Sequence, residues 1–278
     1  MTTTHPNPYR LTPADRQAFD EKGYWVSPAL FDAGRVESLR RAHERIWARD
    51  YDVPTFPLYP DLVRDRYEPH KLRKLDNGWW LNDTVRDVVT DGQLGKMAAE
   101  LLGCERVRLW QDQVIYKPPT GDAGVVGNVG WHQDYSYWKS SETTNMLTIW
   151  IALQDTDLDN GGMRSIAGSQ RWGLIEDSDT FFDQNLEGLE AKYGHLGDWA
   201  DEPCIIPAGG ASFHHGLTFH GSGPNHSNEP RLSIVAHVMP DGTAYSGDPQ
   251  YHANVHLLGP RPHVGQKFDN AFFPLMDR

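Results

Sequence analysis

A histidine and an aspartate two residues apart, His132 and Asp134, are the first side chains in this sequence whose types and spacing suggest shared chemistry. If both lie on one strand, they point to the same face, because side chains alternate along a strand. They would then supply two ligands of a 2-His-1-carboxylate iron site, which leaves coordination positions open for reactants. A lone His-x-Asp is a weak signal, so a second histidine has to come from elsewhere in the chain.

Residues 213–223 contain three histidines that could complete such a site. We predict His220, because the glycine and serine that follow it let the backbone approach a bound group closely. His214 has the same strand parity as His220 and would face inward with it, whereas His215 would face outward. Ordinary packing or surface positions are the favoured interpretation for these two histidines.

Arg231 follows His220 by eleven residues, which is enough for a turn and a return strand. By alternation it shares a face with Ser233, while residues 232, 234, 236 and 238 take the other face. A buried arginine is costly unless an anion meets it, and its planar guanidinium matches a carboxylate. The competing interpretation is an ordinary ion pair with one of the 38 acidic side chains.

Helices are expected to precede these residues. Thr12, Pro13 and Asp15 form a helix start, with an N-cap, a proline in the first helical position and an acid in the first turn, and Gly23 is expected to end this helix. The other N-terminal elements are predicted to be a strand at 24–26, helices at about 32–48 and 84–102, and a loop at 51–69.

Beyond residue 106 the sequence changes to short alternating apolar runs separated by Gly, Pro, Asn and Asp. This density of short strands is typical of a sandwich or barrel and not of βαβ units. Residues 172–204 are polar and aromatic, which indicates a functional loop or lid between strands. The expected strands are 107–117, 131–137, 146–153, 211–220 and 232–240. We therefore predict a helical N-terminal layer packed against a β-barrel.

The composition limits the classes of partner. The chain has 278 residues with 26 basic and 38 acidic side chains, a net charge of −12, so nucleic acid is not an expected partner. Cys104 and Cys204 lie far apart and indicate neither a disulfide framework nor a zinc knuckle. No apolar run reaches the length of a membrane span, and the first ten residues are polar and not signal-like. We expect a soluble, cytoplasmic protein with a small-molecule substrate, and the oligomeric state is left open.

His132, Asp134, His220 and Arg231, in this order and within strand-like sequence, resemble the phytanoyl-CoA dioxygenase family of Fe(II)/2-oxoglutarate oxygenases. The resemblance covers most of the chain. Its further segments are 11–30, 113–119, 131–134, 147–153 and 160–163. Where the family usually has Pro-Gly-Ser-His, residues 167–170 read Ala-Gly-Ser-Gln, a departure that affects a turn and not the metal ligands.

The resemblance implies a single domain over residues 1–278, mainly β with a helical layer. Its core would be a double-stranded β-helix, a jelly-roll or cupin-like barrel, flanked by N-terminal helices. The expected parts are a helical layer at about 1–105, a barrel core at about 106–240 with a lid insert at about 172–204, and a C-terminal extension at about 241–278.

The resemblance also implies roles for individual residues. His132, Asp134 and His220 would bind Fe(II) and act in catalysis, and Arg231 would pair with the distal carboxylate of 2-oxoglutarate, with O₂ as the oxidant. Further cosubstrate contacts would be Ser233, Ser222, Trp150, Gln133, Gln113 and Lys74. For Gln113 and Lys74, a structural glutamine and a surface lysine are equally weighted alternatives.

The expected activity is hydroxylation of an unactivated C–H bond in a small or mid-sized organic substrate, with release of succinate and CO₂. A natural-product intermediate or a modified amino acid fits the aromatic, weakly charged surroundings of the site. The expected substrate contacts are Tyr135, Trp138, Met146, Thr148 and Arg164.

Other classes remain open at this point. A cupin-like isomerase or hydrolase would use the same metal ligands without 2-oxoglutarate, but Arg231 has no evident purpose there. Zinc could also be held by His and Asp in a hydrolase. The complete ligand set argues against a non-catalytic binding module, and Asp134 argues against a halogenase relative, in which the carboxylate position is vacant for chloride.

Overall fold

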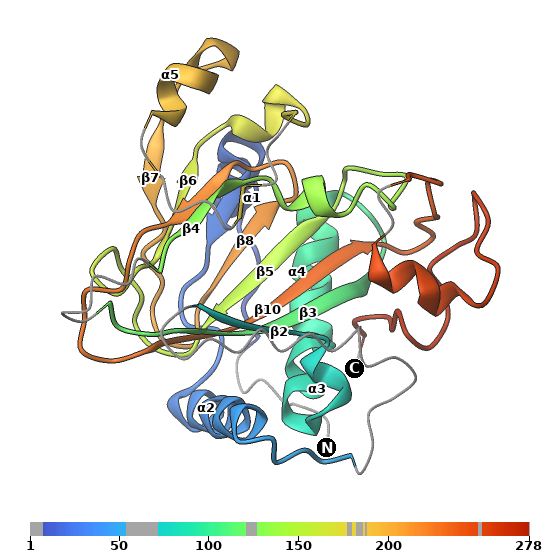
Figure 1. Ribbon diagram of the computed structural model, residues 1–278, viewed down its shortest axis with the longest axis horizontal. Helices are drawn as coiled ribbons and strands as arrows, with labels where there is room; N and C mark the ends of the chain where they lie inside the picture. Colours follow the sequence, from blue (N-terminus) through green and yellow to red (C-terminus); the bar gives the residue numbers. More distant parts are fainter. Residues whose placement is uncertain are drawn as a thin grey trace.

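Ten strands form two antiparallel β-sheets at the centre of the computed structural model (Figure 1), which describes residues 8–53, 72–120, 127–176, 180–181, 186, 188–249 and 252–277. The strands are β1 Tyr24–Val26, β2 Arg73–Asp76, β3 Val107–Lys117, β4 Val129–His132, β5 Leu147–Ala152, β6 Met163–Ile166, β7 Asp201–Pro203, β8 Ala211–His215, β9 His220–Ser222 and β10 Arg231–Pro240. One sheet has the order β1-β8-β5-β10-β3-β2, and the other has the order β4-β9-β6-β7.

The chain crosses repeatedly between the two sheets. From β3 to β10 each strand lies in the sheet opposite to its predecessor, except that β6 and β7 pair with each other. Such alternation in an antiparallel double sheet is a jelly roll. The predicted fold class, mainly β with N-terminal helices, is therefore confirmed, while the division of the chain into parts stays a prediction.

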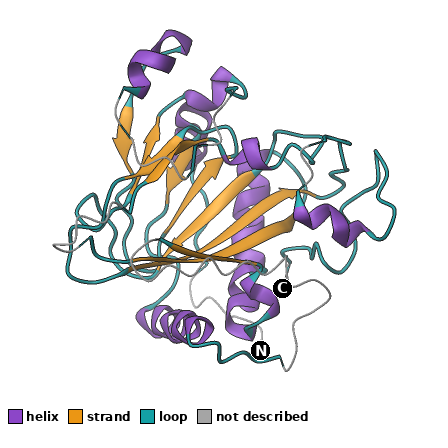
Figure 2. Ribbon diagram, viewed as in Figure 1, coloured by secondary structure: helices purple, strands orange, loops and turns teal. Residues whose placement is uncertain are grey.

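The described residues form five α-helices, and most of them pack on the six-stranded sheet. They are α1 Pro13–Lys22, α2 Ala33–Trp47, α3 Asp83–Val89, α4 Gly92–Leu102 and α5 Leu189–Tyr193. Figure 2 shows α3 and α4 behind this sheet, whereas α5 stands apart beside β7. Within the described part of the chain, no helix combines the length and the apolar character that crossing a membrane requires.

The alternation predicted for β10 is confirmed. Its even-numbered residues from Leu232 to Val238 belong to the large apolar core that includes α3 and α4. Its odd-numbered residues face the four-stranded sheet, where Val235 packs with Ile115 of β3 and Met163 of β6. The space between the sheets, lined from both sides, is where polar side chains gather.

Several predicted elements have different bounds in the structure. The helix starts at Thr12 and Asp32 are confirmed, with Thr12 and Asp15 forming a capping box. The single helix predicted at 84–102 is wrong: α3 ends at Val89, and Asp91 caps a new helix by accepting hydrogen bonds from the backbone N–H groups of the next turn.

Two predicted strands are shorter than expected. The strand predicted at 131–137 ends at His132, and Asp134–Tyr137 form a 3₁₀ turn. The strand predicted at 211–220 is two strands, β8 and β9, which lie in different sheets. Most of the loop predicted at 51–69 lies outside the described residues, and β2, just after it, was not predicted.

A buried carboxyl in this core makes stability depend on pH. Asp112 on β3 is fully buried, and burial raises its pKa to about 8 although the Trp79 backbone N–H donates to it, with Asp76 adding to the rise. The folded protein therefore keeps a proton that the unfolded chain loses near pH 4, so stability falls as pH rises from about 4 to 8. The slope reaches about 1.4 kcal/mol per pH unit.

Asp112→Asn is expected to behave like the protonated side chain at every pH. Its melting temperature should already exceed that of the wild type at pH 5, and the difference should grow up to about pH 8, as measured by circular dichroism. Asp20→Asn, which changes an exposed aspartate of α1, is the control. A constant difference between wild type and Asp112→Asn from pH 5 to 9 contradicts the raised pKa.

Candidate metal centre

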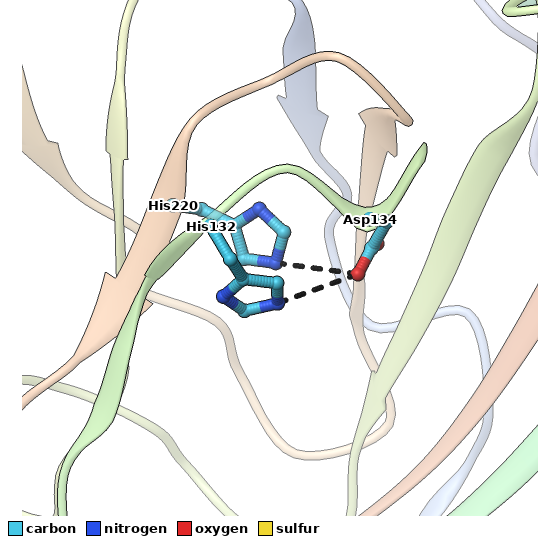
Figure 3. Close-up of side chains that lie close together, drawn as sticks. All are labelled: His132, Asp134 and His220. Atoms are coloured by element: carbon cyan, nitrogen blue, oxygen red, sulfur yellow. Dashed lines mark ion pairs between the residues drawn. The ribbon is translucent and has the colours of Figure 1, made fainter. Parts of the chain in front are cut away.

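Three buried side chains converge between the two sheets. His132, at the end of β4, and His220, at the start of β9, are direct cross-strand partners with ring centroids 4.3 Å apart. Asp134 Oδ1 lies 3.4 Å from His132 Nε2 and 3.9 Å from His220 Nε2 (Figure 3). One ligand atom from each residue lies within 4.8 Å of the other two. The set matches a 2-His-1-carboxylate metal site.

Asp134 reaches the two histidines by a different route from the one expected. The strand ends at His132, so Asp134 is turned inward by the 3₁₀ turn and not by strand alternation. The glycine after His220 also serves another purpose. A Cβ on Gly221 would lie 3.0 Å from the carbonyl oxygen of Val129, so glycine permits β9 to approach β4 and brings the histidines together.

Hydrogen bonds from the backbone orient both imidazole rings. His132 Nδ1 lies 2.7 Å from the carbonyl oxygen of Gly130, and His220 Nδ1 lies 2.9 Å from that of Thr218. A carbonyl only accepts, so each Nδ1 carries a proton, and each Nε2 is directed toward Asp134, where a metal would bind. This arrangement is typical of metal-binding histidines.

The carboxylate of Asp134 is ionised and its two oxygens have different partners. Burial opposes ionisation, but His220, His132 and His214 hold the pKa of Asp134 well below its usual range. Oδ1 faces the two histidine ligands, while Oδ2 accepts a 2.5 Å hydrogen bond from Thr148 Oγ1. Thr148 thus leaves one oxygen free for a metal, which makes it a positioning residue for the ligand.

Thr148→Val is expected to lower the affinity for Fe(II) by roughly 10- to 100-fold, the usual cost of losing a hydrogen bond to a metal ligand. Valine keeps the shape of threonine and removes only the hydroxyl. Thr148→Ser, which keeps the hydroxyl, is the matched control and should bind Fe(II) within a few-fold of wild type. Anaerobic Fe(II) titration monitors both variants, and equal affinity for Fe(II) in Val and Ser variants would contradict the positioning role.

Two further histidines line the same cavity. His214 Nε2 lies 3.3 Å from Asp134 Oδ2, and its ring centroid is 4.5 Å from that of His220. His237 Nδ1 lies 2.8 Å from Thr148 Oγ1. The packing or surface position favoured for His214 is therefore not what the structure shows. His237 was not singled out, although its parity with Arg231 on β10 could have indicated it.

The other end of the cavity carries two buried cations. Arg231 lies over the Trp150 ring, 4.9 Å from its centroid, and donates to the carbonyl oxygen of Gly161. Lys117 Nζ donates to the same carbonyl at 3.3 Å and to Ser222 Oγ at 2.7 Å. Burial lowers the pKa of Arg231 to about 9, and burial beside Arg231 lowers the pKa of Lys117 as well.

These cations have the surroundings of an anion-binding site. Across the described residues, no carboxylate lies within ion-pair distance of Arg231 or Lys117, which excludes the ordinary ion pair weighed for Arg231. Arg231 Nε and Ser233 Oγ are buried without hydrogen-bond partners. Buried polar atoms of folded proteins nearly always have a partner, so this end fits a carboxylate ligand.

Two predicted cosubstrate contacts lie in or beside the cavity. Gln113 lines it. Lys74 Nζ lies 3.3 Å from Asp76 Oδ1 and 5.2 Å from the ring centroid of Phe181. Phe181 comes from the segment predicted as a lid, and its ring centroid is 5.0 Å from that of His132. This segment thus contacts a candidate metal ligand, while residues 177–179, 182–185 and 187 of it lie outside the described part.

The structure does not bring the other predicted contacts to the cavity. Gln133 Nε2 donates to the carbonyls of Gly173 and Leu217, so its side chain connects neighbouring loops. Arg164 forms a two-pronged ion pair with Asp201, at 2.8 and 2.6 Å.

Three of the predicted substrate contacts are core side chains. Tyr135 donates to the carbonyl of Ser141 at 2.9 Å, and Met146 is fully buried. Trp138 packs against His237 at 4.7 Å between centroids, so it supports a residue of the cavity wall. All three belong to the large apolar core.

The chain is similar to curated proteins and solved structures of one class. It is 28% identical over 241 residues, 83% of this chain and 80% of the relative, to a probable alpha-ketoglutarate-dependent hypophosphite dioxygenase of Stutzerimonas stutzeri. The solved carbocyclase SnoK from nogalamycin biosynthesis superposes with a TM-score of 0.73 at 22% identity, covering 95% of this chain and 96% of that one. The epimerase SnoN, solved with Fe³⁺, alpha ketoglutarate and nogalamycin RO, superposes with a TM-score of 0.71 at 21% identity, covering 95% and 97%.

The structural likeness confirms the jelly-roll fold, and a family model identifies the family. Residues 19–233 match the model of phytanoyl-CoA dioxygenase (PhyH). This match begins within the first helix and includes both histidines of the candidate metal site, Asp134 and Arg231. The family resemblance seen in the sequence is confirmed: the chain belongs to the phytanoyl-CoA dioxygenase family, a family of dioxygenase enzymes.

Proposed function

We propose that this protein is an Fe(II)- and 2-oxoglutarate-dependent dioxygenase that hydroxylates a C–H bond of a small or mid-sized organic substrate. One observation carries the proposal: a single cavity holds the triad of His132, Asp134 and His220 and, at one end, the buried Arg231 without a carboxylate partner among the described residues. Membership of the family and the alpha-ketoglutarate dependence named for the Stutzerimonas relative support it.

The residues of the cavity have distinct parts in this proposal. Fe(II), together with 2-oxoglutarate and O₂, supplies the oxidising chemistry when bound, with succinate and CO₂ as coproducts. His132, Asp134 and His220 would hold the iron. Arg231, stacked on Trp150, would bind the distal carboxylate of 2-oxoglutarate.

Lys117 and Ser222 add to the carboxylate-binding end. The sequence did not single out Lys117 for this role, because a lysine at the end of a strand is usually solvated. Here its side chain is fully buried beside Arg231, and it donates to Ser222 Oγ. Lys117 Nζ also donates to the carbonyls of Gly161 and Gly223, so its three protons are taken and it would act through Ser222. The hydroxyl proton of Ser222 is then available to the carboxylate that Arg231 would bind.

The substrate would occupy the rest of the cavity. Its walls are largely apolar, with Leu72, Ile115, Val129, Met163 and Val235 among the lining residues. Such walls exclude water from the reacting centre and favour an organic molecule with few charges. A natural-product intermediate or a modified amino acid is therefore the proposed substrate class.

An anaerobic absorption titration of metal-free protein with Fe(II) and 2-oxoglutarate tests the proposal. We expect a weak visible charge-transfer band that requires both, because the keto acid then binds to iron held by the protein. The rival, a cupin-like isomerase or hydrolase, needs no 2-oxoglutarate. Normal iron binding without such a band would overturn the dioxygenase proposal in favour of this rival.

A further inference from the structure

His237 presents an unsatisfied nitrogen atom to the cavity at the end away from Arg231. Both residues are on the same face of β10, six residues or about 20 Å apart along the strand. The side chain of His237 lines the cavity and is nearly fully buried, and its Nε2 has no hydrogen-bond partner among the described residues. A buried polar atom that faces a ligand cavity is normally satisfied by the ligand or by water.

A chain of hydrogen bonds determines what this atom can offer. The hydroxyl of Thr148 donates its single proton to Asp134 Oδ2 at 2.5 Å. Thr148 Oγ1 can then only accept from His237 Nδ1, 2.8 Å away. The proton of the neutral His237 ring is therefore on Nδ1, and Nε2 carries a lone pair.

The orientation of this ring is held from two sides. Trp138 packs against it with ring centroids 4.7 Å apart, and His237 is the direct cross-strand partner of Thr148. Burial also lowers the pKa of His237 to about 3, so the ring is neutral at physiological pH. Nε2 is thus a fixed acceptor and not a group that switches between donating and accepting.

We propose that His237 Nε2 accepts a hydrogen bond from the substrate, which therefore carries a hydroxyl, amide or amine donor and not an oxyanion at this position. This inference rests on the proposed function, because it concerns the substrate of the same site. Lys74 is a cation near this end, but it is paired with Asp76 and lies over Phe181. It therefore does not compensate for the repulsion between the Nε2 lone pair and a bound anion. Apolar side chains such as Ile115, Met163 and Val235 line other parts of the cavity, so the donor is the polar part of an otherwise apolar molecule.

Three probes distinguish the possible ligands: cyclohexanol, its methyl ether, which lacks the donor, and hypophosphite, an oxyanion. Each is added to the anaerobic protein loaded with Fe(II) and 2-oxoglutarate, and perturbation of the charge-transfer band gives its Kd. We expect cyclohexanol to bind at least about tenfold more tightly than the ether, because the ether leaves the acceptor unsatisfied. Hypophosphite should not displace it.

His237→Asn is the diagnostic variant, since an amide N–H can still meet Thr148 while the Nε2 acceptor is lost. It should lose the preference for cyclohexanol and keep the charge-transfer band. His226→Asn, which changes an exposed histidine, is the control and should keep both. In parallel, the ¹⁵N spectrum of histidine-labelled, zinc-loaded protein should show His237 protonated at Nδ1 only.

Equal binding of the alcohol and the ether, including equally undetectable binding, would overturn the inference, as would a proton on His237 Nε2 or tight binding of hypophosphite that His237→Asn abolishes. Failure of the underlying proposal has a separate signature. If wild-type protein forms no charge-transfer band before any probe is added, the dioxygenase function itself is wrong.

Discussion

Asp134→Ala is expected to abolish succinate formation from 2-oxoglutarate. The substitution removes the one anionic ligand of the triad and leaves His132 and His220 to hold a divalent cation without charge compensation. The loss of Fe(II) affinity should exceed the roughly 10- to 100-fold that removal of a supporting hydrogen bond costs. Anaerobic Fe(II) titration and succinate quantification measure the two effects separately.

Folding should survive this substitution, which keeps the result interpretable. Asp134 is a buried charge, and its burial opposes its ionisation. Replacing it by alanine removes this desolvation cost and leaves no other buried carboxylate unpaired. Circular dichroism checks the fold, and Asp20→Ala on the surface is the control for activity. Succinate production at the wild-type rate by Asp134→Ala would remove the metal assignment.

Arg231→Leu is expected to weaken 2-oxoglutarate binding while leaving Fe(II) binding intact. Losing one partner of a buried, hydrogen-bonded charge pair costs about 2–5 kcal/mol, or roughly 30- to 5,000-fold in Kd. Lys117 remains, but it lacks the planar fork that matches both carboxylate oxygens. The concentration of 2-oxoglutarate that half-saturates the charge-transfer band measures the change.

Although Arg231→Leu should weaken 2-oxoglutarate binding, it should not lower the stability of the ligand-free protein. The pKa of Arg231 is lowered to about 9 by burial, so the folded, ligand-free protein holds this charge at a cost below that pH. Arg231→Leu should therefore melt no lower than wild type without ligand, and 2-oxoglutarate should stabilise only the wild type. Arg231→Lys, which keeps the charge, should bind 2-oxoglutarate with intermediate affinity. An unchanged Kd for 2-oxoglutarate in Arg231→Leu would remove the cosubstrate role.

The class of fold and the main residues of the candidate site can be predicted from the sequence alone. Strand alternation placed Arg231 on the face opposite Leu232, and the capping residue Thr12 marked the start of the first helix. The order of His132, Asp134, His220 and Arg231 indicated the family. These features can be predicted because they depend on local periodicity or on residue order, and both are observed directly in the sequence.

Local patterns failed where the chain changes direction. Alternation placed Asp134 on the strand of His132, and it treated His214 and His220 as neighbours on one strand. The structure ends the first strand before Asp134 and puts the two histidines in opposite sheets, yet all of these side chains meet. The 3₁₀ turn positions Asp134, and the crossing between sheets positions His220. Neither feature produces a periodic pattern in the sequence.

The surroundings of the reacting groups depend on the tertiary structure. The hydroxyl of Thr148 meets Asp134 and His237 because β5 and β10 are paired in register, and Lys117 meets Ser222 because the two sheets face each other. Contacts of this kind join residues far apart in the chain. The packing of the two sheets determines which donors, acceptors and charges come close enough to interact.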